Sequence, residues 1–336
     1  MTNFSPSDGI NVAARGIYNY VTKRPLIISF EVTLSCNCNC RHCDLGGLIK
    51  DERQIKPDDY ARLTRLLKPP LAQLSGGEPL LRKDIVAIVK AIKGSSGIPY
   101  LILVTNGVLL NESNYIQLHE AGVNQLSVSL DFPDERHDEF RRHRGLYGHL
   151  DETIPKLAQL GYGDIILNTA ITRANLEEVL PLAQKAKDWG VSISYSAYTL
   201  LRTNDDSYAI NTPGDLAILR KAIYELIELT KQTNHITNSE TVLLDTLNFF
   251  EQGYMPNCKA GIRFLVVMPD GAFVPCSLHR NKYSTQKEMI QNFSRTNQCG
   301  GCYVAIRSYS DRSLWGLLKD APRYAKQLFA RHAGNI

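Results

Sequence analysis

The strongest constraint on the fold is a pattern that repeats along residues 26–198, in which a β-branched apolar run is followed by a loop and an amphipathic helix. Such runs predict buried strands, and apolar residues at three- and four-residue spacing predict the helices between them. Strands that alternate with helices form a parallel sheet. The repeat therefore predicts an α/β fold with a partial (β/α)6 barrel of the TIM type, with strands at 26–33, 71–75, 100–105, 125–131, 164–171 and 191–198.

The remaining segments are shorter and differ in composition. The polar, turn-rich stretch 199–215 predicts a domain boundary after the barrel. Further along, two short apolar runs flank Pro269-Asp270-Gly271, which predicts a hairpin. The predicted segments are a lead-in (1–25, helical over 13–23), the barrel (26–198), a helical linker (199–257, helices at 214–232 and 239–252), a small cysteine-containing module (258–312, strands at 264–268 and 272–275) and a C-terminal segment (313–336, helical over 313–330).

Composition excludes several classes of protein. The 336 residues are 43% hydrophobic and 21% charged, as in a globular protein rather than a disordered one. The net charge of +4 is too small to indicate a nucleic-acid partner. No apolar run approaches the roughly 20 residues of a membrane helix, and the N-terminus lacks the features of a secretory signal. These observations predict a cytoplasmic protein without a transmembrane segment.

Eight cysteines fall in two tight groups, which indicates metal binding. The cytoplasm keeps thiols reduced, so disulfides are not expected, and purely structural thiols would be scattered along the chain. The first group follows the first predicted strand and the second lies in the C-terminal module. The groups are Cys36, Cys38, Cys40 and Cys43, and then Cys258, Cys276, Cys299 and Cys302.

The first group contains the spacing C-x3-C-x2-C at Cys36, Cys40 and Cys43. Three thiolates on one loop can hold three irons of a [4Fe–4S] cluster and leave the fourth iron open. A zinc site with Cys38 or His42 as its fourth ligand satisfies the same spacing. Spacing alone leaves both metals possible.

The later strands are also followed by polar motifs. After the second strand comes Ser75-Gly76-Gly77-Glu78-Pro79, in which two glycines permit close backbone approach and the Glu78 carboxylate suits an ammonium group. A plain turn with a helix-capping acid is the alternative. Chemistry in βα barrels sits at this end of the strands. Further candidates here are Asn106 after the third strand, Ser127, Ser129 and Asp131 alternating on the fourth, Arg144 beyond it and Asn168 on the fifth.

Together, C-x3-C-x2-C after the first strand and Gly-Gly-Glu-Pro after the second resemble the radical S-adenosylmethionine superfamily over residues 26–198. The resemblance implies that Cys36, Cys40 and Cys43 bind the cluster, whose open iron takes the amino and carboxylate groups of S-adenosylmethionine. Gly76, Gly77 and Glu78 match the motif that holds the methionine ammonium. By the same resemblance Asn106, Ser129, Asn168 and Arg144 are candidates for ribose and carboxylate contacts, and Cys38 has no role.

The C-terminal cysteines resemble the shortened auxiliary-cluster module called twitch, a relative of the longer SPASM module. Cys258, Gly271, Cys276 and the pair Cys299-Gly300-Gly301-Cys302 carry this likeness. It implies one auxiliary [4Fe–4S] cluster ligated by Cys258, Cys276, Cys299 and Cys302. A structural zinc site is the alternative. Substrate is then expected between the two clusters, with Tyr195, Tyr198 and Arg202 as possible contacts.

The resemblance implies a biosynthetic enzyme that receives one electron from a donor such as flavodoxin or ferredoxin. It would cleave S-adenosylmethionine to a 5′-deoxyadenosyl radical and take a hydrogen atom from its substrate. With no extra N-terminal domain to bind a leader peptide, a small-molecule substrate is expected. An auxiliary cluster with four cysteine ligands could accept an electron from a substrate radical, so a net two-electron oxidation is expected. The alternatives are ribosomal-peptide maturation, redox-neutral epimerisation and, in another class, a zinc-stabilised binding module without catalysis.

Overall fold

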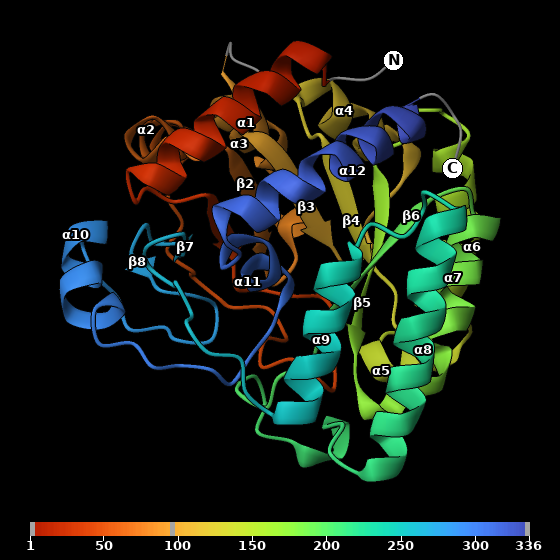
Figure 1. Ribbon diagram of the computed structural model, residues 1–336. Coiled ribbons are helices and arrows are strands. Elements are labelled where there is room, and N and C mark those ends of the chain that lie inside the picture. The colour runs from red at the N-terminus through yellow and green to blue at the C-terminus, as the bar shows by residue number, and fades with distance from the viewer. Residues whose placement is uncertain (1–3, 95–97, 333–336) are drawn as a thin grey trace.

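The computed structural model describes residues 4–94 and 98–332, and its centre is one sheet of eight strands (Figure 1). The strands are β1 (Ile27–Thr33), β2 (Leu71–Gly76), β3 (Tyr100–Thr105), β4 (Gln125–Ser129), β5 (Ile165–Ile171), β6 (Ser192–Ala197), β7 (Phe264–Val267) and β8 (Phe273–Val274). Their order across the sheet is β6-β5-β4-β3-β2-β1-β7-β8. All neighbouring pairs from β6 to β7 are parallel, and β8 alone runs antiparallel to β7. The α/β class and the parallel sheet predicted from the sequence are confirmed.

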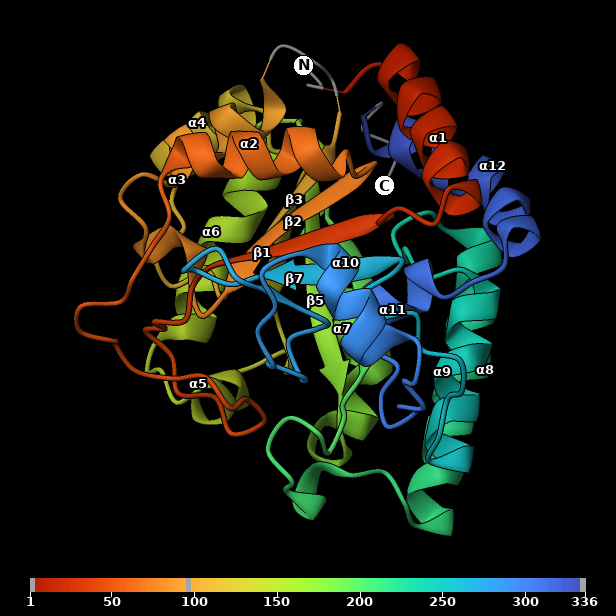
Figure 2. The same cartoon turned by 90° about the vertical axis from the view of Figure 1, so that its left-hand side faces the viewer.

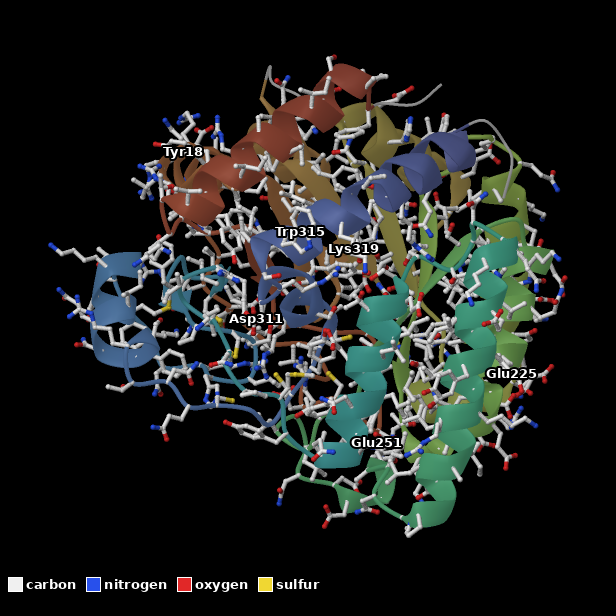
Figure 3. All side chains as sticks on the ribbon, viewed as in Figure 1. Tyr18, Glu225, Glu251, Asp311, Trp315 and Lys319 are labelled. Carbon is white, nitrogen blue, oxygen red and sulfur yellow. The ribbon has the colours of Figure 1, made fainter. Side chains whose placement is uncertain are left out.

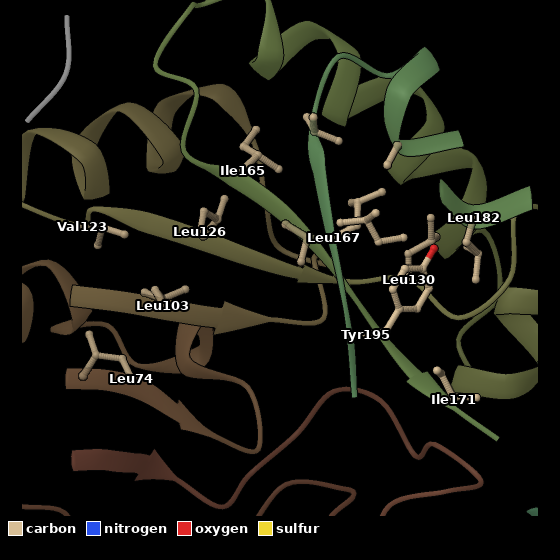
Figure 4. Close-up of a cluster of buried hydrophobic side chains, with 14 of the residues drawn as sticks. Leu74, Leu103, Val123, Leu126, Leu130, Ile165, Leu167, Ile171, Leu182 and Tyr195 are labelled. Atoms are coloured by element: carbon tan, nitrogen blue, oxygen red, sulfur yellow. The ribbon is translucent and has the colours of Figure 1, made fainter. Parts of the chain in front are cut away.

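Helices pack on the outer face of the curved sheet and bury its alternate residues. Phe30 on β1 meets Tyr60 of α2 edge to face, with ring centroids 5.4 Å apart. Further along the sheet, Leu74, Leu103 and Leu167 are fully buried on this face (Figure 4). Each such leucine contributes about 1.5–3 kcal/mol by leaving water. The covering helices are α2 (Pro57–Leu67), α3 (Ile85–Lys93), α4 (Glu112–Ala121), α6 (Leu146–Ala158) and α7 (Val179–Asp188).

The helix expected between the fifth and sixth predicted strands forms as two pieces, the 3-10 helix η2 (Arg173–Glu178) followed by α7. Within η2, the backbone of Asn175 departs from helical geometry, with a φ of −121°. Its side-chain amide instead donates to the carbonyl oxygens of Asp131 and Ala170. Asn175 thus connects the segment after β4 to the end of β5 by hydrogen bonds.

The C-terminal third of the chain continues the sheet. Ile27 on β1 pairs with Phe264 on β7, so β7 occupies the edge of β1 that β2 leaves free (Figure 2).

The helix α1 (Pro6–Val21), longer than predicted, lies beside α12 (Leu314–His332) across one end of the molecule (Figure 1). The other elements are η1 (Pro79–Leu81), α5 (Arg136–Arg141), η3 (Asp206–Tyr208), α8 (Pro213–Gln232), α9 (Glu240–Gln252), α10 (Gln286–Met289), the π-helix η4 (Ile290–Ser294) and α11 (Ala305–Ser310).

The domain boundaries predicted at 198 and 257 remain predictions, although the shared sheet joins the segments on either side of them. The ends of the predicted N- and C-terminal segments, residues 1–3 and 333–336, lie outside the described residues. Across the parts of the chain that are described, none of the helices has the length and apolar character needed to cross a bilayer.

The continuous sheet makes a prediction about stability. Leu265 on β7 is fully buried, so Leu265→Ala should cost about 2–5 kcal/mol of unfolding free energy. Urea unfolding followed by far-UV circular dichroism measures this cost, and one transition should report both halves of the chain. Leu318→Ala, at a side chain that is 44% exposed, is the control and should cost far less. Equal small losses in both variants would contradict the packing of β7 against the barrel.

Candidate active site

The loop after β1 and the loop after β2 are in direct backbone contact at the C-terminal edge of the sheet. The N–H of Gly77 donates to the carbonyl of Thr33 at 2.7 Å, and the N–H of Glu78 donates to that of Ser35 at 2.8 Å. A Cβ at Gly76 would lie 2.0 Å from the Thr33 oxygen, and one at Gly77 would lie 2.1 Å from the Ser35 oxygen. Gly76 also has a φ of +127°, which L side chains rarely adopt. The two glycines are therefore required to bring these loops together, apart from any ligand.

Glu78 connects this pair of loops to the loop after β3. Its side chain is fully buried. One carboxylate oxygen accepts from the Leu80 N–H at 2.9 Å and the Thr105 hydroxyl at 2.8 Å, and the other accepts from the Asn106 N–H at 2.7 Å. Burial raises the pKa of Glu78 to about 7, against the lowering effect of these donors. Glu78 thus caps η1, as the alternative reading of the motif held, and also places a carboxyl group at the strand ends.

Three of the first four cysteines form a compact buried group. Cys36, Cys38 and Cys40 are 8%, 2% and 8% exposed, and the N–H of Cys38 lies 3.5 Å from the sulfur of Cys36. A hydrogen bond from the Cys38 thiol lowers the pKa of both Cys36 and Cys40. Cys43 is half-buried, and desolvation raises the pKa of its thiol. Cys38, expected to be a spare thiol, lies between its neighbours.

Nitrogen donors point at two of these sulfurs. The side-chain amide of Asn106 lies 3.7 Å from the sulfur of Cys36, and Nη1 of Arg141 lies 3.7 Å from that of Cys40. N–H donors stabilise thiolate over thiol, the form in which cysteine binds metal. The environment of Cys36 and Cys40 therefore fits cysteines that hold an iron–sulfur cluster.

Arg141, rather than Arg144, is the arginine at this site. Arg141 is buried, and its Nε donates to Oδ2 of Asp131 at 2.7 Å. Burial alone would raise the pKa of Asp131, but Arg141 brings it below its usual value. Arg144 is an exposed residue beyond α5, and none of the contacts described above involves it. The sequence interpretation missed Arg141 because α5 is short and its buried face carries no apolar repeat.

Ser129 and Asn168, two of the predicted cofactor contacts, lie side by side on neighbouring strands. They are paired across β4 and β5, and both are half-buried on the same face. Tyr195 lies on the opposite face of β6, where its hydroxyl donates to the Val179 carbonyl at 2.7 Å, so the expectation of a substrate contact there was wrong (Figure 4). Tyr198 bonds Thr203, while Arg202 reaches Asp44 of the cysteine loop at 2.9 Å.

The C-terminal cysteines form a second group. Burial is the main reason that the pKa of Cys276 is raised, and the nearby charges of Cys302 and Cys258 raise it further. His279, which the sequence interpretation did not single out, places Nε2 3.4 Å from the sulfur of Cys299. Its backbone N–H also donates to the sulfur of Cys276 at 3.3 Å.

A fully buried arginine fixes the backbone around this second group. Arg307 donates to the carbonyls of Met255, Pro256 and Cys302, which orders the approaches to Cys258 and Cys302. Asp311, labelled in Figure 3, accepts from Arg307 Nε at 2.7 Å and from the Lys259 N–H at 3.1 Å. Neither Arg307 nor His279 belongs to a recognisable motif, so only the fold reveals them.

Within residues 4–94 and 98–332, no three histidine, cysteine or acidic side chains are arranged around a position for a single metal ion. The assignment of both cysteine groups as cluster ligands therefore remains a prediction. It rests on the fold position of the groups and on the donors that surround them.

Comparison with known proteins settles the family. The model of the radical SAM superfamily matches residues 30–212, more than half of the chain. The chain belongs to the radical SAM superfamily. Members use a [4Fe–4S] cluster and S-adenosylmethionine, so those cofactors follow from membership, whereas an auxiliary cluster does not.

Individual relatives agree with this assignment. The chain is 33% identical over 282 residues to the AdoMet-dependent heme synthase of Methanosarcina barkeri, covering 76% of this chain and 78% of that protein. It is 25% identical over 279 residues to a probable GTP 3′,8-cyclase of Methanothermobacter marburgensis, covering 80% and 90%. Among solved structures, Streptococcus suis SuiB bound to precursor peptide SuiA has a TM-score of 0.60 at 18% identity, covering 94% and 69%. That last likeness shows the fold.

The buried pair of Arg141 and Asp131 predicts a contrast between two neighbouring arginines. Arg141→Met leaves the buried carboxylate of Asp131 unpaired and should cost about 3–5 kcal/mol of unfolding free energy. Arg144→Met, three residues away and exposed, should change it by less than about 0.5 kcal/mol. Urea unfolding measures both. Similar losses in the two variants would refute the distinction drawn between these arginines.

Proposed function

We propose that this enzyme binds S-adenosylmethionine at the C-terminal edge of the sheet and uses it to oxidise a small molecule. In this proposal Cys36, Cys40 and Cys43 hold the first cluster, and Cys258, Cys276, Cys299 and Cys302 of an auxiliary module at 258–312 hold a second. The first cluster, once reduced by an external one-electron donor, supplies the cleavage of S-adenosylmethionine to methionine and a radical that removes hydrogen from substrate.

The convergence of three loops at Glu78 is the observation that carries this proposal. Its buried carboxylate and the Gly76-Gly77 backbone lie where the loop of Cys36 meets the loop of Asn106. A carboxylate accepts about four hydrogen bonds, and the three donors already present leave room for an ammonium group. We assign the methionine ammonium to Gly76, Gly77 and Glu78, and further contacts of the cofactor to Asn106, Ser129 and Asn168. Arg144, which is exposed, stays a proposed contact for the carboxylate of S-adenosylmethionine.

The auxiliary group supports an oxidation over a redox-neutral reaction. With four cysteines available for four irons, no iron is left open to bind substrate, so the second cluster can accept the electron that a substrate radical loses together with a proton. Epimerisation needs a thiol that returns hydrogen, and Cys38 is buried between Cys36 and Cys40. A small molecule is supported by two of the relatives, which are named for heme synthesis and for GTP cyclisation.

Iron content tests the two-cluster assignment. Anaerobically reconstituted protein should hold about eight irons per chain, and replacing Cys36, Cys40 and Cys43 by alanine should leave about four. Bound zinc in place of iron would refute the cluster assignment at the group concerned. A triple variant that kept the full iron content would show that the first cluster is held elsewhere.

Glu78→Gln tests the ammonium contact without deleting the side chain that ties the loops together. Gln keeps an acceptor oxygen but loses the charge, so affinity for S-adenosylmethionine should fall roughly 10- to 100-fold, as expected for a charged hydrogen bond of about 1.5–3 kcal/mol. Because the pKa of Glu78 is raised to about 7, wild-type affinity should also weaken as pH falls below that value and the carboxyl takes up a proton. Calorimetry measures both effects. Equal affinity in variant and wild type at pH 8 would remove Glu78 from the binding site.

A further inference from the structure

Several strands of the sheet have half-buried residues on the face turned away from the helices, the inner face, and many of these residues are polar. On β2, Gln73 and Ser75 are half-buried while the residues between and beside them, Ala72 and Leu74, are fully buried. The same alternation occurs on β3, and on β5 at Asn168 and Ala170. The outer face is thus packed under helices, whereas the inner face carries half-buried residues, and we call the space that this inner face borders the lumen.

Glu31 is a buried carboxylate on that inner face. It pairs with Ser75 across β1 and β2, and Phe30 and Val32 on either side of it point to the helix layer. Among the inner-facing strand residues of β1 to β6, all of which are described, it is the one carboxylate, and no lysine or arginine accompanies it. It is 2% exposed, and its Oε2 has no hydrogen-bond partner. The hydroxyls of Ser29 and Ser75 on the same face bond each other at 2.8 Å.

Two nearby arginines, Arg202 and Arg280, form ion pairs with Asp44 rather than with Glu31. Arg202 contacts Asp44 at 2.9 Å, and Arg280 shares the same carboxylate at 3.5 Å. Burial lowers the pKa of Arg202, and the charges of Cys43, Asp44 and Glu31 more than offset that effect. The charge of Glu31 therefore contributes to the raised pKa of Arg202, although the two side chains form no ion pair.

Burying a carboxylate without a partner costs folding free energy, so a protein that keeps such a group is expected to use it in its function. The position of Glu31 suits a ligand contact, since the strand carrying it runs within two residues into Thr33, where the two loops of the active site meet. A Cβ on Gly76 would lie 3.4 Å from the Cα of Glu31, so the backbone of Glu31 lies directly beside Gly76.

We propose that Glu31 is a substrate-binding residue whose free oxygen receives an ammonium group of the substrate. A cationic nitrogen is the group that compensates a lone buried carboxylate, and it would hold the substrate in the lumen next to the S-adenosylmethionine site. This inference rests on the proposed function and adds to it the substrate class, an amine.

The free enzyme provides the first test. Glu31→Gln removes an uncompensated buried charge, so the Tm of the ligand-free protein should stay the same or rise. Glu52→Gln is the matched control, because Glu52 accepts from the Thr33 hydroxyl and from the Leu34 N–H, and its Tm should fall. A Tm that falls in Glu31→Gln as in Glu52→Gln would show that Glu31 is a structural residue and would overturn the proposal.

The second test uses defined probes of equal length, butylamine, butanol and butyrate, with enzyme that carries its clusters and S-adenosylmethionine. Butylamine should raise the Tm of wild type more than butanol does, and butyrate should not raise it. Glu31→Gln should lose the butylamine shift, while Glu152→Gln, at an exposed carboxylate paired with Lys156, should keep it. No butylamine shift in wild type, or an equal shift in Glu31→Gln, would overturn the proposal.

Two controls separate this inference from the proposed function. Glu31→Gln should keep the wild-type iron content and the wild-type affinity for S-adenosylmethionine measured by calorimetry. Loss of that affinity would make Glu31 a cofactor contact and contradict the substrate role. If wild type itself fails to cleave S-adenosylmethionine under dithionite, the proposed function fails first, whatever the probes show.

Discussion

The close approach of the backbone after β1 to the backbone after β2 is the contact on which the site depends. Gly76 and Gly77 let two N–H groups reach the carbonyls of Thr33 and Ser35, and a Cβ at either glycine would overlap those oxygens. The cysteine loop starts at this contact, so its position relative to the sheet is fixed by main-chain hydrogen bonds. Glu78 then extends the connection to the loop after β3. Three strand ends thus become one rigid platform before any cofactor binds.

Around this platform the protein buries charge, and most of that charge is compensated. Asp131 has Arg141, and Arg307 has Asp311 and three carbonyl oxygens. Breaking such a pair by removing one partner costs about 3–5 kcal/mol, so these residues order the loops that carry the cysteines. Glu31 differs from them because it is equally buried but lacks a partner for one oxygen. That contrast within one molecule is the reason to regard Glu31 as a ligand contact.

Much of the fold is readable from the sequence, because strands such as β3 are mostly apolar runs that amphipathic helix patterns separate from the next strand. Glycines such as Gly122 and Gly190, which precede strands, have positive φ and follow the ends of helices, and a glycine between a helix pattern and a strand pattern is readable in the sequence as such an end. The motifs after β1 and β2 identify the family because two independent patterns occur in the right order. Periodicity carries no information on partners far apart in sequence, so the pairing of β7 with β1 was not foreseen. Arg141, His279 and Glu31 were missed for the same reason, since each acquires its role from neighbours in space.

The central claim is that the loop after β1 holds a cluster whose open iron binds S-adenosylmethionine. Electron paramagnetic resonance on the dithionite-reduced Cys299→Ala/Cys302→Ala variant tests it most directly, because only the first cluster should then contribute a signal. Addition of S-adenosylmethionine should shift the g-values of that signal, since the amino and carboxylate groups become ligands of the iron. A spectrum unchanged by saturating S-adenosylmethionine, or the absence of any cluster signal in this variant, would contradict the account.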